Sequence, residues 1–170
     1  MTAIDKLLIT IQEAIEIEKF GYTFYTNMRS FVKDRDGHKF ISYLANLEVE
    51  HIKWLEDQYK KQLKKLESFD ESKTVDISII GKDEIFITDN MPQIFKEFDK
   101  IKALDFAIGI EKRSVEFYKK NMDIIEDDEL KQLFKRLVDF ESEHIEILSE
   151  AKKNLQTTNN WLSIGMHFHW

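Results

Sequence analysis

Two short segments of this sequence place a glutamate and a histidine three residues apart inside an otherwise apolar helical stripe. LEVEHI contains Glu48 and His51, and FESEHI contains Glu141 and His144. Residues three and four positions apart share one face of a helix, so each pair falls where core residues are expected. Carboxylates and imidazoles are ligands of divalent metals in proteins. The two segments therefore predict a metal site inside a helical core.

The two segments belong to an internal repeat with a constant offset of 93 residues. AIEIEKFGYTFY, which contains Glu18 and Tyr25, resembles AIGIEKRSVEFY, which contains Glu111 and Tyr118. Each half thus supplies a lone glutamate from one helix and a Glu-x-x-His from the next. A single Glu-x-x-His on a charged helix is usually a solvent-exposed face, but a second copy at a fixed offset favours a shared chemical role.

Four glutamates in a core need a balancing charge. An unpaired buried carboxylate costs several kcal/mol even after relaxation, and neighbouring carboxylates repel one another unless protons or cations neutralise them. Two divalent cations would neutralise four carboxylates, with both imidazoles neutral. A glutamate from each of two helices and a Glu-x-x-His from each of two others is the known arrangement of di-iron and di-manganese bundles. Packing alone would not prefer glutamate and histidine at core positions.

Composition narrows the class of protein. The 170 residues carry a net charge of −7 and no cysteine. The negative charge argues against nucleic-acid binding, and the lack of cysteine excludes disulfides, zinc ribbons and iron–sulfur clusters. The N-terminus has neither a signal-peptide nor a transit-peptide pattern, and no apolar run is long enough to span a membrane. We expect a soluble, cytoplasmic protein.

These residues can share helix faces only if the segments around them form long helices. The sequence therefore predicts an all-α chain. The periodicity predicts four helices, at about 2–32, 36–66, 102–121 and 127–154, and a further helix start at residues 90–92. The expected caps are Thr2 with Asp5, then Asp36, then Asp127 or Asp128. In the first helix, Ile11, Glu18, Tyr22 and Tyr25 should share the core-facing stripe.

Loop lengths set the topology. The first and last helix pairs have short connections and should form two antiparallel hairpins, whereas residues of about 67–101 form a long connection. A helix of thirty residues is about 45 Å long, so this segment can cross over along the bundle and make the second and third long helices parallel. We expect a four-helix bundle over residues 1–155 and an aromatic tail over 156–170, with residues 75–79 extended.

On these motifs the chain resembles the ferritin-like superfamily, and within it the rubrerythrin-type di-iron carboxylate proteins, over about residues 3–154. The resemblance implies two iron ions, with manganese or zinc as alternatives. Glu18 and His51 would be terminal ligands of one ion, and Glu111 and His144 of the other. Glu48 and Glu141 would bridge the two ions. The candidate catalytic residues Tyr25 and Tyr118 would hydrogen-bond the ligand carboxylates; the alternative is that they only fill the core.

The resemblance also implies an activity: an oxidoreductase that reduces hydrogen peroxide or dioxygen. Rubrerythrins commonly carry another glutamate three residues after the third-helix ligand, where this chain has Ser114, so the resemblance does not extend to the ligand exchange associated with that residue. They usually carry a rubredoxin domain with four cysteines, so electrons would come here from a separate donor such as a rubredoxin. The alternatives are a ferroxidase in iron storage and a bundle whose metals serve only folding.

The remaining candidates have structural interpretations. Glu50 and Glu143 also obey the offset but point about 100° away from the adjacent histidine, so we expect them to face solvent or to contact the ligands from outside, and not to be ligands themselves. We expect His38 at the surface. His167 and His169 could bind a metal, but packing of the tail is the favoured interpretation. Apolar residues that look exposed favour association, with a homodimer as the simplest expectation; they are Ile77, Ile79, Ile80, Ile85, Phe86, Trp161 and Trp170.

Overall fold

The computed structural model describes residues 3–65 and 91–161. Within these ranges the chain is helical, without strands, and the all-α prediction is confirmed. The helices are α1 (Ala3–Phe31), α2 (Arg35–Lys64), α3 (Met91–Lys96), α4 (Lys100–Met122) and α5 (Asp128–Thr158). Outside the described residues lie the predicted cap at Thr2, the predicted extended segment 75–79, both tail histidines, and the apolar crossover and tail residues other than Trp161.

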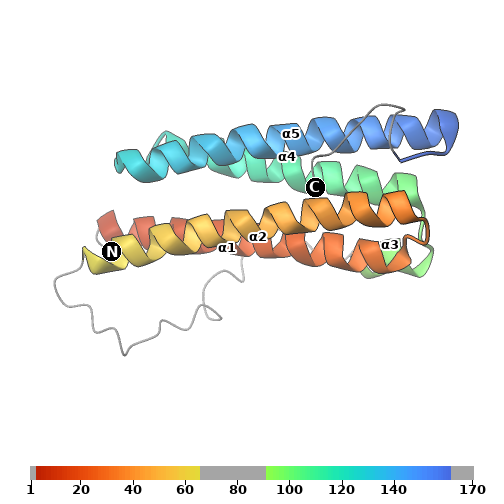
Figure 1. The fold of residues 1–170 in the computed structure, drawn as a ribbon. Helices are drawn as coiled ribbons and strands as arrows, with labels where there is room; N and C mark the ends of the chain where they lie inside the picture. The colour runs from red at the N-terminus through yellow and green to blue at the C-terminus, as the bar shows by residue number, and fades with distance from the viewer. Residues whose placement is uncertain (1–2, 66–90, 162–170) are drawn as a thin grey trace.

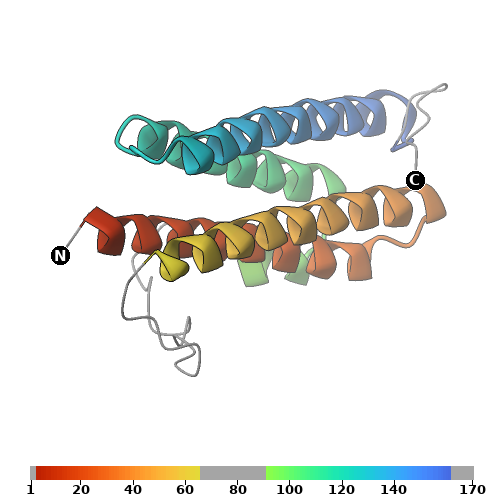
Figure 2. The same ribbon diagram turned by 60° about the vertical axis from the view of Figure 1, so that its left-hand side comes forward.

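The long helices form two hairpins (Figures 1 and 2). α1 packs along α2 and α4 packs along α5, and the hairpins meet through α1 with α4 and α2 with α5. The colours of Figure 1 show that α2 and α4 both run away from the end where α3 lies. The second and third long helices are therefore parallel, as the length of the crossover predicted.

Aspartate side chains start three of the long helices. Asp34 accepts a hydrogen bond from the backbone N–H of Gly37, and Asp127 accepts one from Leu130. Asp99 accepts from Lys102 and starts α4 two residues before the predicted position. The predicted cap at Asp36 is wrong, because Asp36 lies in the first turn of α2 and the Asp34 side chain reaches the free N–H three residues ahead.

Two helix ends also differ from the prediction. α2 ends at Lys64, two residues early. α5 continues four residues beyond Asn154, its predicted end, to Thr158. Asn159 ends it with a φ of 57°, and its backbone N–H donates to the Leu155 carbonyl at 3.2 Å. Asparagine tolerates this left-handed conformation, so it can end a helix as glycine does.

The core consists of two apolar clusters, one toward each end of the bundle. One includes Phe24, Met28, Phe40, Leu148 and Trp161. The other includes Leu8, Ile15, Leu55, Phe134 and Leu137. Along each long helix, the candidate ligands fall between the residues of these two clusters, so the polar groups have apolar packing on both sides.

Tyr22 does not belong to this core, contrary to the sequence prediction. Its side chain is 40% exposed, whereas Gly21, Phe24 and Tyr25 are buried. Packed helices cross at an angle, so the buried stripe winds around α1 instead of following one straight line. Beyond Glu18 the buried face has moved away from Tyr22.

Trp161 is buried, with 2% of its surface exposed, so it does not need a second subunit to cover it. Its Nε1 donates a hydrogen bond of 2.7 Å to Asp34, and the ammonium of Lys100 lies 5.5 Å from the ring centroid. A Cβ atom at Gly37 would lie 2.2 Å from the Nε1 atom, so only glycine permits this approach. Trp161, three residues after the end of α5, thus packs against the start of α2.

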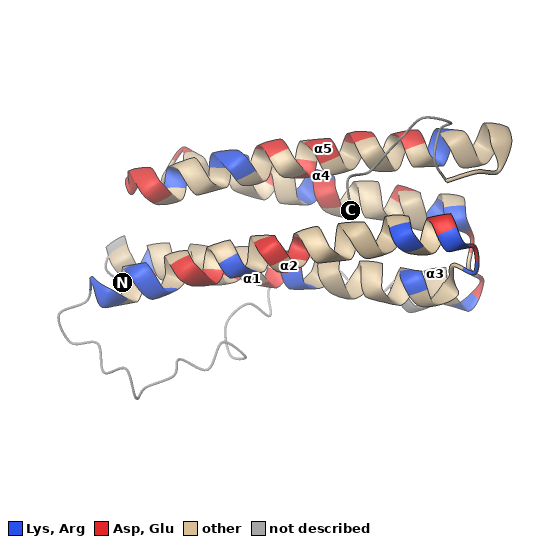
Figure 3. Cartoon of the chain, viewed as in Figure 1, with Lys and Arg blue, Asp and Glu red and all other residues tan. Residues whose placement is uncertain are grey.

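Charged residues of both signs are spread along all four long helices (Figure 3). None of the described helices is long and apolar enough to cross a membrane. The acidic candidate ligands are the exception to the surface pattern, because they lie inside the bundle.

Candidate metal centre

Six candidate ligands meet between the two apolar clusters, and all four long helices contribute. They are Glu18 from α1, Glu48 and His51 from α2, Glu111 from α4, and Glu141 and His144 from α5. Each is at most 2% exposed. The structure therefore brings together all six residues that the sequence predicted as metal ligands.

These side chains form two overlapping groups. One group is Glu18, Glu48, His51 and Glu141, and the other is Glu48, Glu111, Glu141 and His144. Within each group the possible ligand atoms all lie within 4.8 Å of one another. Glu48 and Glu141 belong to both groups, which is the position that bridging carboxylates require. Metal binding by these residues remains a prediction.

The two imidazoles lie on either side of one carboxylate. The Nδ1 atom of His51 lies 3.0 Å from Glu18 Oε2 and 3.1 Å from Glu141 Oε1. The Nδ1 atom of His144 lies 2.9 Å from Glu141 Oε2. The two rings are stacked with their centroids 5.6 Å apart. Glu141 therefore offers one oxygen to each half of the site.

Several of these buried atoms lack a hydrogen-bond partner within the described part of the chain. They are Glu48 Oε1, both carboxylate oxygens of Glu141, and both ring nitrogens of His144. The contact between His144 and Glu141 is close but does not have hydrogen-bond geometry. Buried polar atoms without partners are rare and point to a missing ion or water. Cations between these oxygens and nitrogens would satisfy them, so the donor set fits a pair of divalent metals.

The electrostatics of the cluster also favour cations. Burial, followed by the charge of Glu141, raises the pKa of Glu48 and of Glu111 well above the ordinary glutamate value. Burial alone would raise the pKa of Glu141 too, but the His144 and His51 imidazoles outweigh it and hold this pKa below its ordinary value. Without metal, the carboxylates share the site with protons, so metal binding should release protons.

Burial and contacts with charged neighbours also have opposite effects on the pKa of His51. Burial lowers its pKa, but the contacts with Glu141 and Glu18 outweigh burial and raise the pKa to about 10. A charged imidazole can balance a carboxylate, but it cannot bind a metal through the protonated nitrogen. Metal ligation by His51 therefore requires the loss of this proton.

Two buried tyrosines cross between the halves of the site. The Tyr25 hydroxyl on α1 donates to Glu111 on α4, and the Tyr118 hydroxyl on α4 donates to Glu18 on α1. Burial raises the pKa of both tyrosines well above the ordinary value, so both remain protonated donors. The resemblance implied these hydrogen bonds. Each tyrosine supports the carboxylate of the opposite half.

Gly21 and Ser114 occupy equivalent positions of the repeat but have different surroundings. A Cβ atom at Gly21 would lie 3.1 Å from the carboxyl carbon of Glu48, so glycine lets this carboxylate lie close against α1. Ser114 is buried, and its hydroxyl donates to the Ile110 carbonyl of its own helix at 3.3 Å. The hydroxyl is therefore used within α4.

Sequence reasoning missed two aromatic neighbours of His51. The ring centroid of His51 lies 5.3 Å from that of Trp54 and 5.5 Å from that of Phe140. Trp54 and Phe140 also contact each other at 5.5 Å. A signal existed, because Trp54 follows His51 by three residues and so lies next to it on α2.

The other candidates lie where they were expected, as far as the structure describes them. Glu50, Glu143 and His38 are exposed. Burial, followed by the charges of Glu143 and Glu50, raises the pKa of Tyr43, which places the two glutamates near this tyrosine and outside the ligand groups.

Comparisons with known proteins agree with this fold. A hypothetical protein from Pyrococcus furiosus has a similar structure, with a TM-score of 0.65 and 19% sequence identity. The match covers 92% of this chain and 97% of that chain, and at this identity it shows the fold alone. No curated protein matches the chain. The family model described as rubrerythrin matches residues 10–152, which include all six candidate ligands and both tyrosines. The chain therefore belongs to the rubrerythrin family.

Proposed function

We propose that this protein binds two iron ions and reduces hydrogen peroxide or dioxygen. The observation that supports the proposal is the pair of overlapping ligand groups that share Glu48 and Glu141, with buried ligand atoms left unpartnered. Two adjacent iron ions would supply the two electrons needed to cleave one O–O bond.

The side chains of the site have distinct tasks in this proposal. Glu18 with His51 and Glu111 with His144 hold one ion each, and the two shared glutamates hold both. Tyr25 and Tyr118 fix the orientation of the terminal carboxylates through their hydrogen bonds. Such outer partners tune ligand basicity and metal affinity. The apolar clusters on both sides keep bulk water away from the site.

The source of electrons lies outside the chain. Because the sequence has no cysteine, it has no iron–sulfur or rubredoxin site of its own, and we propose a separate electron-donor protein such as a rubredoxin. Ser114 stands where many rubrerythrins carry another glutamate, and its hydroxyl is bound to Ile110. We therefore propose that the six ligands keep their places when the oxidation state changes.

The metal content tests the first half of the proposal. Elemental analysis of protein purified without added metal should find two iron atoms per chain. Removal of the metal by a chelator should lower the melting temperature near pH 7, because clustered carboxylates lose their counterions. Two zinc atoms in place of iron would contradict the redox function, and unchanged melting after chelation would contradict metal binding at this site.

Stopped-flow oxidation of the ferrous protein tests the second half. Oxidation by hydrogen peroxide or by dioxygen should be complete at two electrons per chain and should be repeatable after re-reduction. Accumulation of hundreds of iron atoms per oligomer would instead support storage. The matched control is Glu50→Gln, because Glu50 is exposed and lies outside both ligand groups.

A further inference from the structure

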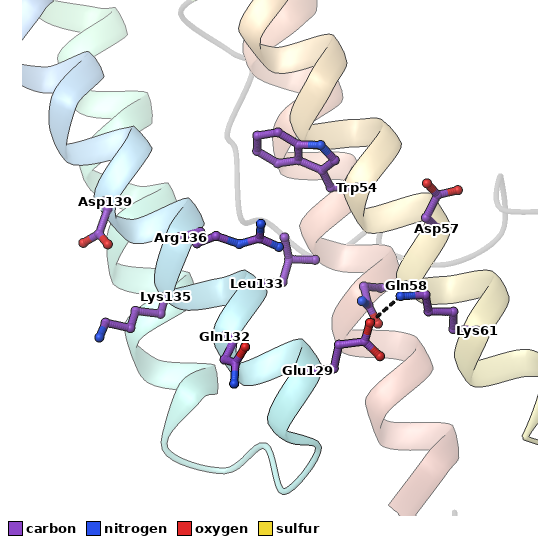
Figure 4. Close-up of a pocket in the computed structure, with 10 residues that line it drawn as sticks. All are labelled: Trp54, Asp57, Gln58, Lys61, Glu129, Gln132, Leu133, Lys135, Arg136 and Asp139. Carbon is purple, nitrogen blue, oxygen red and sulfur yellow. Dashed lines mark hydrogen bonds and ion pairs between the residues drawn. The ribbon is translucent and has the colours of Figure 1, made fainter.

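A groove of about 630 Å³ lies between α2 and α5, at the C-terminal part of α2 and the N-terminal half of α5 (Figure 4). Its charged lining residues are three acids and three bases, namely Asp57, Glu129, Asp139, Lys61, Lys135 and Arg136. Lys61 and Glu129 form an ion pair across it. Opposite charges in equal number give the lining no formal net charge.

The corresponding positions at the other end of the bundle carry different side chains. Gln58 and Leu133 line the groove, and their equivalents in the repeat are Ala151 and Phe40. Both equivalents are buried in the apolar cluster that contains Trp161, whose ring centroid lies 5.9 Å from that of Phe40. The repeat therefore places similar backbone at both ends but equips it with different side chains.

Trp54 connects the groove with the candidate metal centre. It lines the groove, and its ring also contacts the ring of His51, which is 1% exposed. The Arg136 guanidinium lies 5.9 Å from the Trp54 ring centroid. Figure 4 shows the two side chains reaching toward each other from α2 and α5. Phe140 packs on the same indole from α5, so Trp54 is held on several sides.

We infer that the groove is the route by which metal ions and small solutes reach the buried ligands, and that the Trp54 indole is the barrier at its inner end. The inference rests on the proposed metal centre. A large ring between an open groove and a buried imidazole must move before a solute can pass, so it should limit exchange rates. Arg136 would hold the closed position through its contact with the indole face.

The test uses cobalt(II), whose absorption reports its coordination. Metal-free full-length protein is mixed with cobalt(II) to measure uptake, and the loaded protein is mixed with a chelator to measure release. Trp54→Ala should accelerate both uptake and release by about tenfold, equivalent to a barrier lowered by about 1.4 kcal/mol. The affinity, which is the ratio of the two rates, should change much less than either rate.

Ile147→Ala is the matched control, because Ile147 is equivalent to Trp54 in the repeat and packs against the apolar cluster that contains Trp161. Both of its rates should remain within about twofold of the wild-type rates, a change well below that of one tenfold step. If Trp54→Ala is poorly folded, Trp54→Leu and Arg136→Ala provide the same comparison with smaller changes, and both should accelerate exchange.

The outcomes separate the barrier from the metal centre. Failure of the wild-type protein to bind two cobalt ions per chain would contradict the proposed function. Binding of two ions with rates that Trp54→Ala leaves unchanged would overturn the barrier alone. Faster release without faster uptake would mean that Trp54 contributes affinity, and it would also overturn the inference. Equal acceleration in Ile147→Ala would show that any truncation loosens the site, with the same consequence.

Discussion

One turn after its histidine, the α1–α2 hairpin carries Trp54, whereas the α4–α5 hairpin carries Ile147. Other pairs diverge in the same way: Gly21 corresponds to Ser114 in the repeat. The candidate ligands and the tyrosines, by contrast, are identical in type in the two halves. The candidate ligand set is therefore more alike between the two halves than the residues around it.

In this repeat, residue types are kept more strictly among the candidate ligands than among their neighbours. Each tyrosine donates to the carboxylate of the other hairpin, and two glutamates belong to both groups. A change in one ligand should therefore affect the other half, whereas Trp54 and Ile147 lie outside both ligand groups.

The shared glutamates should give the largest effect. Glu48→Gln and Glu141→Gln should each weaken binding of both cobalt ions by more than about a hundredfold, because a ligand matters at least as much as its outer partners. Glu18→Gln should leave one ion tightly bound at Glu111 and His144. Cobalt titration followed by absorbance measures both stoichiometry and affinity. Retention of two tight ions in Glu48→Gln would show that it does not bridge.

The tyrosines should give a smaller effect that crosses between the halves. Tyr25→Phe removes the hydrogen bond to Glu111 and should lower the affinity for the ion in the α4–α5 half by about tenfold. A double-mutant cycle with Glu111→Gln should show coupling, and one with Glu18→Gln should be additive. Titration of cobalt binding measures each corner of the cycles. The reverse pattern would mean that each tyrosine acts within its own hairpin.

Gly21 and Ser114 test the close packing around the shared carboxylates. Gly21→Ala should destabilise the loaded protein by about 1 kcal/mol, because the new Cβ displaces the carboxylate of Glu48. Ser114→Ala should change stability by less than about 0.5 kcal/mol, since its hydroxyl binds only a carbonyl of its own helix. Urea unfolding with saturating cobalt measures both. Equal effects would contradict the difference in packing.

The helix caps Asp34 and Asp127 are also equivalent in the repeat, and they should give the smallest effect. Although burial opposes it, hydrogen bonds from Gly37, Trp161 and Lys100 lower the pKa of Asp34. A hydrogen bond from Lys65 is the main cause that lowers the pKa of Asp127. A lowered folded-state pKa stabilises the protein above the unfolded value of about 3.9 and loses this contribution as the pH falls through the folded value.

The measurement is the free energy of unfolding of the chelated protein as a function of pH. Asp34→Asn and Asp127→Asn should each cost at most about 1 kcal/mol near pH 6, because both ion pairs are partly exposed. The difference from wild type should shrink below about pH 4, where the wild-type aspartates begin to take up protons. A difference that grows with acidity would contradict the lowered pKa values.

Much of the site could be predicted from the sequence because its constraints are local. Glu48 and His51 must share a helix face at a spacing of three, and the 93-residue offset repeats that constraint in α5. The length of the crossover was enough to predict that α2 and α4 are parallel. Both arguments depend only on helix geometry and chain length, which the sequence contains.

Features that depend on packing between helices could not be predicted in the same way. Tyr22 is exposed because the buried stripe winds around α1, and a one-helix pattern does not contain the crossing angle. Trp161 is buried because it meets Gly37 and Asp34, residues more than a hundred positions away. Trp54 is next to His51 by helix geometry, but its place in the groove depends on Arg136 and α5.

The hydrogen bond between Trp161 and Asp34 joins positions 127 residues apart in the chain. Closing a loop of that length costs conformational entropy, which grows with loop size and must be offset by contacts that form at the same moment. Neither hairpin can offset it alone, because Asp34 begins α2 and Trp161 follows α5. The indole is therefore a natural reporter of late folding, since its burial marks the moment when the two hairpins have docked.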